Sequence, residues 1–450
     1  MGKLFGTDGI RGLANIELTP ELAFKIGRAG AYVLSKDAKH AATIMVGMDT
    51  RLSGGMLEAA LSAGMCSVGA KVIIVGVIPT PAIAYLTKKH GFDAGVVISA
   101  SHNPFEDNGI KFFSSGGIKL SDQIEEEIES YILYKMDEIP RISGPKLGYR
   151  EYSSGYHDEY IEFLVSTLGG SDLKGLKVIL DCANGATFKV AAKAYEKLGC
   201  ELIIIHNDPD GKNINDNCGS THMESLVEAV KKEKADIGVA YDGDGDRCLL
   251  VDALGNLVDG DQILSICACY LQGQGKLKNN GLVGTVMSNL GLAIMCRNEN
   301  IEFIKTDVGD RYVLEKMLSD GYSLGGEQSG HVIFLDHTTT GDGILTSLQV
   351  LKIIKEKNTP LHGLNNKMSV LPQVLINAKV SNGKKNTYLE HGEIRAAIDK
   401  LEKMFNGNGR VLIRPSGTEP LVRVMLEGED IETLNFEARN MADMIENLLA

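Results

Sequence analysis

Residues 71–78, Lys-Val-Ile-Ile-Val-Gly-Val-Ile, form an almost continuous run of β-branched side chains. Such a run is typical of a strand covered on both faces, as in a parallel sheet. Similar runs lie on either side of it along the chain, at Ala41–Met48 and Ala94–Ser99. The segments between the runs, Gly54–Val68 and Pro81–His90, have the length and residue pattern of helices. The alternation therefore predicts an α/β unit with a largely parallel sheet.

The same alternation starts twice more along the chain, which predicts three α/β units in tandem. The further predicted strands are Leu176–Asp181, Glu201–His206, Asp236–Tyr241, Leu282–Met287 and Glu302–Lys305. The accompanying predicted helices are Phe188–Leu198, Met223–Lys234, Gln262–Leu271, Leu290–Arg297 and Arg311–Leu318.

Beyond residue 371 the pattern changes. A helix at Glu393–Phe405 precedes a strand pair around Gly409–Ile413 and Leu421–Leu426, and a further helix begins at Ile431. This order predicts a smaller α+β domain at the end of the chain.

The polar segments Lys135–Ser154 and His362–Val370 are candidate domain boundaries. We therefore predict four domains: an α/β domain at residues 1–154, two more at 155–256 and 257–368, and an α+β domain at 369–450. This is one more than the three that a length of 450 residues suggests.

The composition excludes several classes of protein. The net charge of −13 argues against a partner such as nucleic acid, which needs a basic face. The longest apolar stretch, Val72–Leu86, is too short to span a bilayer and contains two prolines. The first residues lack a signal-peptide core, and the eight cysteines lack the spacing of zinc sites. These features predict a cytoplasmic protein.

A first polar loop, Val97–Pro104, follows a predicted strand and places Ser101 next to His102. One interpretation makes a serine here a nucleophile or a carrier of a phosphoryl group. The other is a Ser/Asn turn that caps the next element. Ten residues further on, Lys111 is a candidate acid, base or phosphate-binding cation, or else a solvated surface lysine.

A second loop, Ala240–Arg247, carries Asp242, Asp244 and Asp246 between glycines. Three carboxylates at alternate positions repel one another without a cation, and the glycines let the backbone curl so that all three face one point. Oxygen ligands of this kind favour Mg²⁺, and a plain acidic turn is the alternative. Arg247 is suited to orient an anion that the metal also binds.

Two further polar loops complete the set. Residues 325–331, Gly-Gly-Glu-Gln-Ser-Gly-His, offer hydrogen-bonding groups suited to sugar hydroxyls, although a plain hairpin explains them nearly as well. Residues 414–420, Arg-Pro-Ser-Gly-Thr-Glu-Pro, with Arg423 beyond, are suited to hold a phosphate, and a simple hairpin turn is again the alternative. Together the four loops indicate phosphoryl transfer on a substrate that carries phosphate at two positions.

The four motifs at 101–104, 242–247, 326–331 and 414–420 resemble the signatures of the α-D-phosphohexomutase superfamily. They occur in the family order, one per predicted domain, and the resemblance covers essentially the whole chain. Residues 5–12, Gln328 and residues 214–221 resemble the phosphoglucosamine branch of that superfamily. The resemblance implies the four-domain phosphohexomutase architecture around a central cleft.

The resemblance also implies a mechanism. Ser101 would be a phosphoserine and, with Asp242, Asp244 and Asp246, would bind one Mg²⁺ per chain. Its phosphoryl group would pass to O1 of glucosamine 6-phosphate, giving a bound glucosamine 1,6-bisphosphate. The 6-phosphoryl group would then return to the serine and release glucosamine 1-phosphate.

Each remaining site residue receives a role from the same resemblance. A first group would surround the transferring phosphate, with Lys111 or His102 transferring protons: Arg11, His102, Lys111 and Arg247. A second group would hold the sugar hydroxyls or lie beside them: Glu327, Ser329 and His331. A third would grip the non-reacting phosphate: Arg414, Ser416, Gly417, Thr418 and Arg423.

The implied partner is a small phosphorylated amino sugar, with no nucleic acid and no membrane, and the resemblance is compatible with a homodimer. The product would feed the synthesis of UDP-N-acetylglucosamine and cell-wall precursors. Two alternatives stay open: a phosphomannomutase or phosphoglucomutase of the same superfamily, and a non-enzymatic protein that binds Mg²⁺ or sugar phosphates.

Overall fold

A computed structural model of the chain describes residues 4–6, 8–36, 40–381, 383–405, 407–416 and 420–449. The chain forms two compact units. The large unit consists of Met1–Met287 and Ile301–Lys367, and the small unit consists of Ser288–Asn300 and Met368–Ala450. Among the described residues, we find no helix that is both long enough and apolar enough to cross a membrane.

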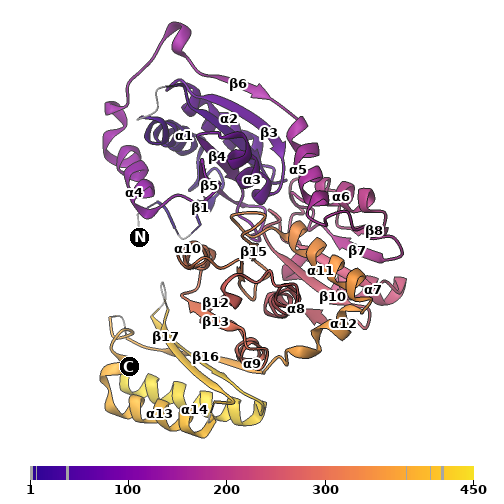
Figure 1. Cartoon of the computed structure of the whole chain (residues 1–450). Coiled ribbons are helices and arrows are strands. Elements are labelled where there is room, and N and C mark those ends of the chain that lie inside the picture. The colour runs from indigo at the N-terminus through magenta and orange to yellow at the C-terminus, as the bar shows by residue number, and fades with distance from the viewer. Residues whose placement is uncertain are drawn as a thin grey trace. The chain divides into compact units, whose positions relative to one another are not determined.

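The first sheet of the large unit has six strands in the order β1-β5-β4-β2-β3-β6 (Figure 1). Its centre is parallel, because β2 pairs in parallel with β3 and β4, whereas β5 runs antiparallel to both β4 and β1. The strands are β1 (Ile10–Leu13), β2 (Thr43–Met48), β3 (Lys71–Val77), β4 (Ala94–Ile98), β5 (Asp107–Ser114) and β6 (Tyr149–Tyr152). The helices are α1 (Pro20–Ser35), α2 (Gly54–Cys66), α3 (Thr80–His90) and α4 (Asp122–Ser130).

The second sheet has five strands in the order β11-β10-β9-β7-β8. Strand β7 pairs in parallel with β8 and β9. The loop at residues 242–247, which carries the three aspartates and is called the aspartate loop below, joins β9 to the antiparallel β10. The strands are β7 (Lys177–Asp181), β8 (Glu201–Ile205), β9 (Ile237–Tyr241), β10 (Cys248–Asp252) and β11 (Leu257–Val258). The helices are α5 (Gly155–Ser166), α6 (Val190–Leu198) and α7 (Glu224–Glu233).

The third sheet has four strands in the order β13-β12-β14-β15. The parallel strands β12 and β13 are followed by β14, whose antiparallel partner β15 begins after the loop that contains Glu327. The strands are β12 (Gly281–Thr285), β13 (Glu302–Thr306), β14 (Leu324–Gly326) and β15 (Val332–Phe334). The helices are α8 (Gly260–Gly273), α10 (Asp310–Asp320), α11 (Gly343–Lys357) and α12 (Leu361–Leu364).

The small unit has an antiparallel three-stranded sheet in the order β16-β18-β17, with α13 and α14 packed against it (Figure 1). Its core contains Val422, Val424, Ala438 and Ile445. The strands are β16 (Gln373–Lys379), β17 (Arg410–Pro415) and β18 (Leu421–Glu427). The helices are α9 (Leu290–Asn298), α13 (Gly392–Phe405) and α14 (Ile431–Leu449).

The predicted architecture of three α/β domains and one α+β domain is confirmed, and every strand and helix predicted from the sequence is present. Two findings refine the candidate boundaries. The polar segment Lys135–Ser154 contains β6, which adds an edge strand in parallel to β3. The chain passes into the small unit not only after Lys367 but also between Met287 and Ser288. The residue limits of the four domains stay a prediction.

Candidate active site

Ser101 lies just beyond the carboxyl end of β4 with a backbone that a serine seldom adopts, at φ 53°. The surrounding structure holds this conformation in place. The Ser101 N–H donates to Ser99 Oγ at 2.9 Å. Its carbonyl oxygen accepts hydrogen bonds from Arg51 Nη2 and from Asn215 Nδ2, both at 2.9 Å. Hydrogen bonds within the loop Val97–Pro104 and to two other segments therefore fix this loop, which is called the serine loop below.

Two of the supporting residues form a fully buried ion pair that sequence reasoning missed. Arg51 Nε lies 2.8 Å from Asp49 Oδ2, and neither side chain is exposed. Asp49 Oδ2 also accepts a hydrogen bond from Ser99 Oγ at 2.5 Å. The available signal was an Asp-x-Arg sequence immediately after β2, at the sheet edge where the serine loop also lies.

The three aspartates of the second loop converge as predicted. One carboxylate oxygen from each of Asp242, Asp244 and Asp246 lies within 4.8 Å of the other two, and all three residues are buried. Oδ1 of Asp244 and of Asp246 are buried without a hydrogen-bond partner among the described residues. Orphaned buried carboxylate oxygens facing one point fit a hard divalent cation.

Gly243 explains how this loop can lie against the serine loop. A Cβ atom at this position would lie 2.5 Å from the carbonyl oxygen of Ser101 and 2.8 Å from Nδ2 of Asn215. Only glycine permits so close an approach of the two backbones. Ser101 Oγ consequently donates a hydrogen bond of 2.6 Å to Asp242 Oδ2.

The three carboxyl groups differ in their electrostatic surroundings. Burial, together with the charges of Asp246 and Asp244, raises the pKa of Asp242 well above its usual value. Burial has the same tendency at Asp244, but the Lys111 ammonium, 2.9 Å away, outweighs it and lowers the pKa of Asp244. Thr80 Oγ1 also donates to Asp244, at 2.8 Å. The loop thus has one carboxylate whose burial and like-charged neighbours outweigh the nearby Arg247, and one whose ion pair outweighs its burial.

The other residues predicted to contact the transferring phosphate lie around Ser101. His102 Nδ1 is 3.4 Å from Ser101 Oγ and 3.3 Å from Arg247 Nη1. Burial and the two nearby arginines, Arg247 and Arg11, lower the pKa of His102. Arg11 Nη1 lies 3.5 Å from the carbonyl oxygen of Ala100.

Lys111 is only 2% exposed, and its ammonium lies 2.9 Å from both Asp244 and Asp8. The alternative interpretation of Lys111 as a solvated surface lysine is therefore wrong. Burial alone would lower the pKa of Lys111, but Asp244 and Asp8 raise it, so that the side chain keeps its positive charge.

The loop between β14 and β15 has three side chains of interest. Glu327 Oε1 accepts a hydrogen bond from the Gly309 N–H at 3.1 Å. Ser329 Oγ is buried without a hydrogen-bond partner among the residues that the structure describes. His331 Nδ1 lies 3.5 Å from Asp246 Oδ2, so this loop is in contact with the aspartate loop.

The fourth loop lies in the small unit. Arg414 and Arg423 are directly opposite each other across β17 and β18, an arrangement of like charges that favours a bound anion. Ser416 is buried, and its carbonyl oxygen accepts a hydrogen bond of 2.6 Å from Lys385 Nζ, a cation that sequence reasoning missed. Gly417 and Thr418, which were also predicted here, lie outside the described residues.

A second group of metal-ligating side chains, Asp181, His206 and Cys218, lies elsewhere in the large unit. Asp181 already accepts hydrogen bonds of 2.9 Å from the N–H groups of Ala183 and Gly219. His206 Nδ1 lies 3.0 Å from Asp181, which raises the pKa of the imidazole. The contacts of Asp181 therefore join the end of β7, the residue after β8 and the segment at Gly219.

Four family models match the chain in sequence order. They describe the phosphoglucomutase/phosphomannomutase alpha/beta/alpha domains I, II and III, at residues 2–137, 158–255 and 259–370, and the C-terminal domain of the same family, at residues 375–444. The chain belongs to the phosphoglucomutase/phosphomannomutase family. Among curated relatives, the phosphoglucosamine mutase of Clostridium novyi is 59% identical over 446 residues, which cover 99% of each chain.

Solved structures agree with this assignment. A phosphoglucomutase/phosphomannomutase family protein from Burkholderia thailandensis superimposes with a TM-score of 0.81 at 26% identity, covering 99% of this chain and 98% of that one. The N-acetylphosphoglucosamine mutase of Aspergillus fumigatus, in complex with GlcNAc-6P and magnesium, has a TM-score of 0.69 at 18% identity, covering 99% and 96% of the two chains. The second likeness supports the fold.

Proposed function

We propose that this enzyme interconverts glucosamine 6-phosphate and glucosamine 1-phosphate, with Ser101 as the carrier of the phosphoryl group. Full-length identity of 56–59% to curated phosphoglucosamine mutases supports an isomerase of this type. The observation that carries the assignment of the site is the hydrogen bond between Ser101 Oγ and Asp242 Oδ2. It links the one serine hydroxyl that the motif singles out to the buried aspartate triad.

Ser101, Asp242, Asp244 and Asp246 are the residues that would hold one Mg²⁺. The unpartnered oxygens of Asp244 and Asp246 support this set, as do the raised pKa of Asp242 and the carboxylate chemistry. When bound, the ion would neutralise charge that develops on the phosphoryl oxygens during transfer.

The reaction consists of two phosphoryl transfers. Both involve Ser101 Oγ, the first with O1 of the sugar and the second with O6. In the first, the bond between Ser101 Oγ and phosphorus breaks, O1 of glucosamine 6-phosphate forms a bond to phosphorus and gives up its proton, and Ser101 Oγ takes up a proton. In the second, the bond between phosphorus and O6 breaks, Ser101 Oγ gives up its proton and forms a bond to phosphorus, and O6 takes up a proton. Glucosamine 1,6-bisphosphate is the intermediate, and the serine is phosphorylated again at the end.

The cations around Ser101 have separate parts in this scheme. Arg11, Lys111 and Arg247 offset the negative charge of the transferring phosphoryl group. Lys111 is suited to this because its two carboxylate partners keep it charged. His102, whose pKa is lowered and whose Nδ1 lies near Ser101 Oγ, is suited to transfer the proton.

The remaining predicted residues would bind the substrate. Glu327 and Ser329 would bind sugar hydroxyls, with His331 between them and the aspartate loop. In the small unit, Arg414 and Arg423, which are opposite each other in the register of β17 and β18, would bind the phosphate that does not react. Ser416, Gly417 and Thr418 would complete that phosphate site.

The first experiment compares turnover of the 6-phosphates of glucosamine, glucose and mannose with the purified full-length enzyme. We expect a clear preference for the amino sugar. Preference for either neutral sugar would instead favour a phosphoglucomutase or phosphomannomutase of the same family.

The second experiment tests the serine. After exposure to glucosamine 1,6-bisphosphate, intact-mass and peptide analysis should find one phosphate on Ser101. Ser101→Ala should lose both this phosphate and mutase activity, whereas Ser166→Ala, at an exposed serine of α5, should keep both. An active Ser101→Ala variant would refute the scheme.

The location in the cytoplasm, the homodimer and the supply of cell-wall precursors stay predictions. Sedimentation of the purified enzyme would test the homodimer directly.

A further inference from the structure

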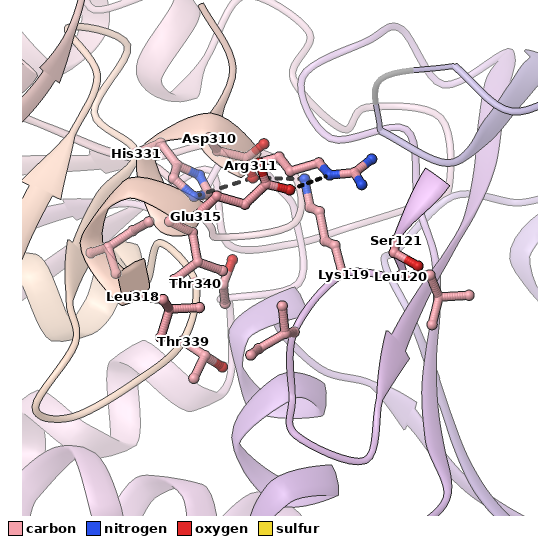
Figure 2. A pocket seen from close by; sticks show the side chains of 13 residues that line it. Lys119, Leu120, Ser121, Asp310, Arg311, Glu315, Leu318, His331, Thr339 and Thr340 are labelled. Carbon is pink, nitrogen blue, oxygen red and sulfur yellow. Dashed lines mark hydrogen bonds and ion pairs between the residues drawn. The ribbon is translucent and has the colours of Figure 1, made fainter. Parts of the chain in front are cut away.

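A single lysine that the scheme above does not use connects two parts of the site. Lys119 Nζ lies 2.5 Å from Asp8 Oδ1 and 2.6 Å from Asp310 Oδ2. The lysine and Asp310 side chains are only 15% and 18% exposed. Figure 2 shows Lys119 and Asp310 facing each other across the gap between their segments, with His331 on the far side of the aspartate. The ammonium of Lys119 therefore forms ion pairs with the carboxylates of both Asp8 and Asp310.

The first carboxylate, that of Asp8, contacts two groups that we assign to phosphoryl transfer. Asp8 Oδ2 lies 2.9 Å from Lys111 Nζ, and the same carboxylate forms an ion pair with Arg11. These are two of the cations assigned to the transferring phosphate. Asp8 thus contacts both of these cations and also Lys119.

The second carboxylate, that of Asp310, contacts the loop between β14 and β15, which carries Glu327, Ser329 and His331 and is called the sugar loop below. Asp310 is the first residue of α10, directly after Gly309, whose N–H donates to Glu327. Asp310 Oδ2 also lies 3.4 Å from His331 Nε2. The first turn of α10 therefore supports the sugar loop at two points.

The carboxylate of Asp310 contacts both Lys119 and the imidazole of His331. Asp310 Oδ2 lies 2.6 Å from Lys119 Nζ and 3.4 Å from His331 Nε2. His331 Nε2 also accepts the N–H of Gly341 at 2.9 Å. The ammonium of Lys119 therefore offsets the charge of a carboxylate that contacts the sugar loop.

Packing alone does not hold the start of α10. A pocket of about 170 Å³, lined by Lys119, Asp310, Arg311 and His331 among others, lies beside it (Figure 2). Besides the lysine, Arg311 forms an ion pair with Asp122, three residues after Lys119. Ion pairs to the segment 119–122 therefore position this turn.

We propose that Lys119 is a positioning residue of the phosphohexomutase site: through Asp8 it fixes Arg11 and Lys111, and through Asp310 it fixes the sugar loop. This inference rests on the proposed function, because it assigns the two ends of the bridge to chemistry and to sugar binding. It predicts that loss of the Asp8 carboxylate mainly lowers kcat, whereas loss of the Asp310 carboxylate mainly raises KM.

The test compares Asp8→Asn, Asp310→Asn, Lys119→Met and Lys119→Arg in the full-length enzyme. Displacement of catalytic groups by about 1 Å can cost about 100-fold in rate. We expect Asp8→Asn to lower kcat by about 10-fold or more with little change in KM. Asp310→Asn should raise KM for glucosamine 6-phosphate by about 10-fold with kcat nearly unchanged. Lys119→Met should show both effects, and Lys119→Arg should recover most of the activity.

Two controls separate positioning from a purely structural role. Lys197→Met breaks a surface ion pair of 2.7 Å with Glu162 and should change neither constant. The double variant Lys119→Met/Asp310→Asn removes both charges, so it should regain thermal stability but keep the raised KM. If Lys119→Met fails to fold, the two asparagine variants and Lys119→Arg still decide the question.

The outcomes are distinct. If wild-type enzyme does not interconvert the sugar phosphates, the proposed function fails and this inference fails with it. If wild-type enzyme is active but Asp8→Asn and Asp310→Asn leave both constants unchanged, or change both in parallel with stability, only the positioning role is refuted.

Discussion

The aspartate loop leads to an unusual prediction: without metal, Asp242→Asn stabilises the enzyme and Asp244→Asn destabilises it. Mutual repulsion alone would predict that either change helps, because each removes one charge from a buried cluster. The structure separates the two, because Asp244 pairs with Lys111 at 2.9 Å whereas the pKa of Asp242 is raised by burial and by its neighbours.

The magnitudes follow from these contacts. Two carboxylate charges separated by 4.8 Å, the upper limit of the separations in this cluster, repel each other by about 3.5 kcal/mol at an effective dielectric constant of about 20. Proton uptake by Asp242 limits this penalty, so we expect Asp242→Asn to gain about 1–3 kcal/mol. Breaking a buried ion pair costs about 3–5 kcal/mol, but Lys111 keeps Asp8, so Asp244→Asn should lose about 2 kcal/mol.

Thermal unfolding in EDTA and in excess Mg²⁺ measures both effects. One kcal/mol shifts the Tm of a domain of about 150–250 residues by about 2–4 °C, so shifts of a few degrees or less are expected here. In EDTA the Tm of Asp242→Asn should rise and that of Asp244→Asn should fall, while Asp158→Asn, at an exposed aspartate of α5, should match the wild type. Excess Mg²⁺ should raise the Tm of the wild type and of Asp158→Asn, but much less that of either loop variant.

Shifts of the same sign for Asp242→Asn and Asp244→Asn in EDTA would refute the electrostatic reasoning. A gain with Mg²⁺ that both variants retain in full would refute the metal site itself.

Three further changes test other parts of the molecule. Ser329→Ala removes a buried hydroxyl that has no partner among the described residues, so it should leave the Tm unchanged but raise KM for the sugar phosphate by about 10-fold in steady-state assays. Gly243→Ala places a Cβ 2.5 Å from the carbonyl oxygen of Ser101 and should lower kcat by about 100-fold; wild-type turnover would disprove the close approach of the two loops. Because the bond to Asp181 raises the pKa of His206, its stabilisation is present below the unfolded pKa of about 6.5 and is lost as pH rises through the folded value. His206→Gln should therefore lower the free energy of unfolding at pH 5.5 by less than about 1 kcal/mol and have almost no effect at pH 8.5, as urea titration at both values would show.

The alternation of apolar runs predicted the buried parallel strands because such strands are covered on both faces. It did not identify β16, Gln373–Lys379, in which exposed and buried side chains are interspersed. It also did not identify β1 and β5, which pair antiparallel at the edge next to the serine loop. β1 has only four residues, and the Asp-Asn-Gly start of β5 resembles a turn. Their pairing with each other joins segments that are distant in sequence, which a local pattern does not contain.

The motifs singled out the residues that we propose as the site, because their polar side chains gather in four loops that follow or join strands. They could not name the supporting residues. Arg51, Asn215 and Lys119 act through contacts with segments at least 50 residues away, and each could equally be a solvated side chain when seen in sequence. Support of this kind depends on the tertiary fold, which a local pattern does not contain.

The small unit takes residues Ser288–Asn300 from the middle of the chain, and Asn289 shows how tightly they belong there. Its side chain forms two hydrogen bonds to the backbone of Leu371, at 2.9 and 3.0 Å, and the N–H of Leu290 donates to Glu427 at 2.7 Å. The polypeptide therefore crosses between the units three times. A protease that cuts near residue 367 would leave both pieces joined through α9, so the nick would be visible on a denaturing gel but not by gel filtration. A recombinant fragment that begins at residue 368 would lack one of the helices of its own unit.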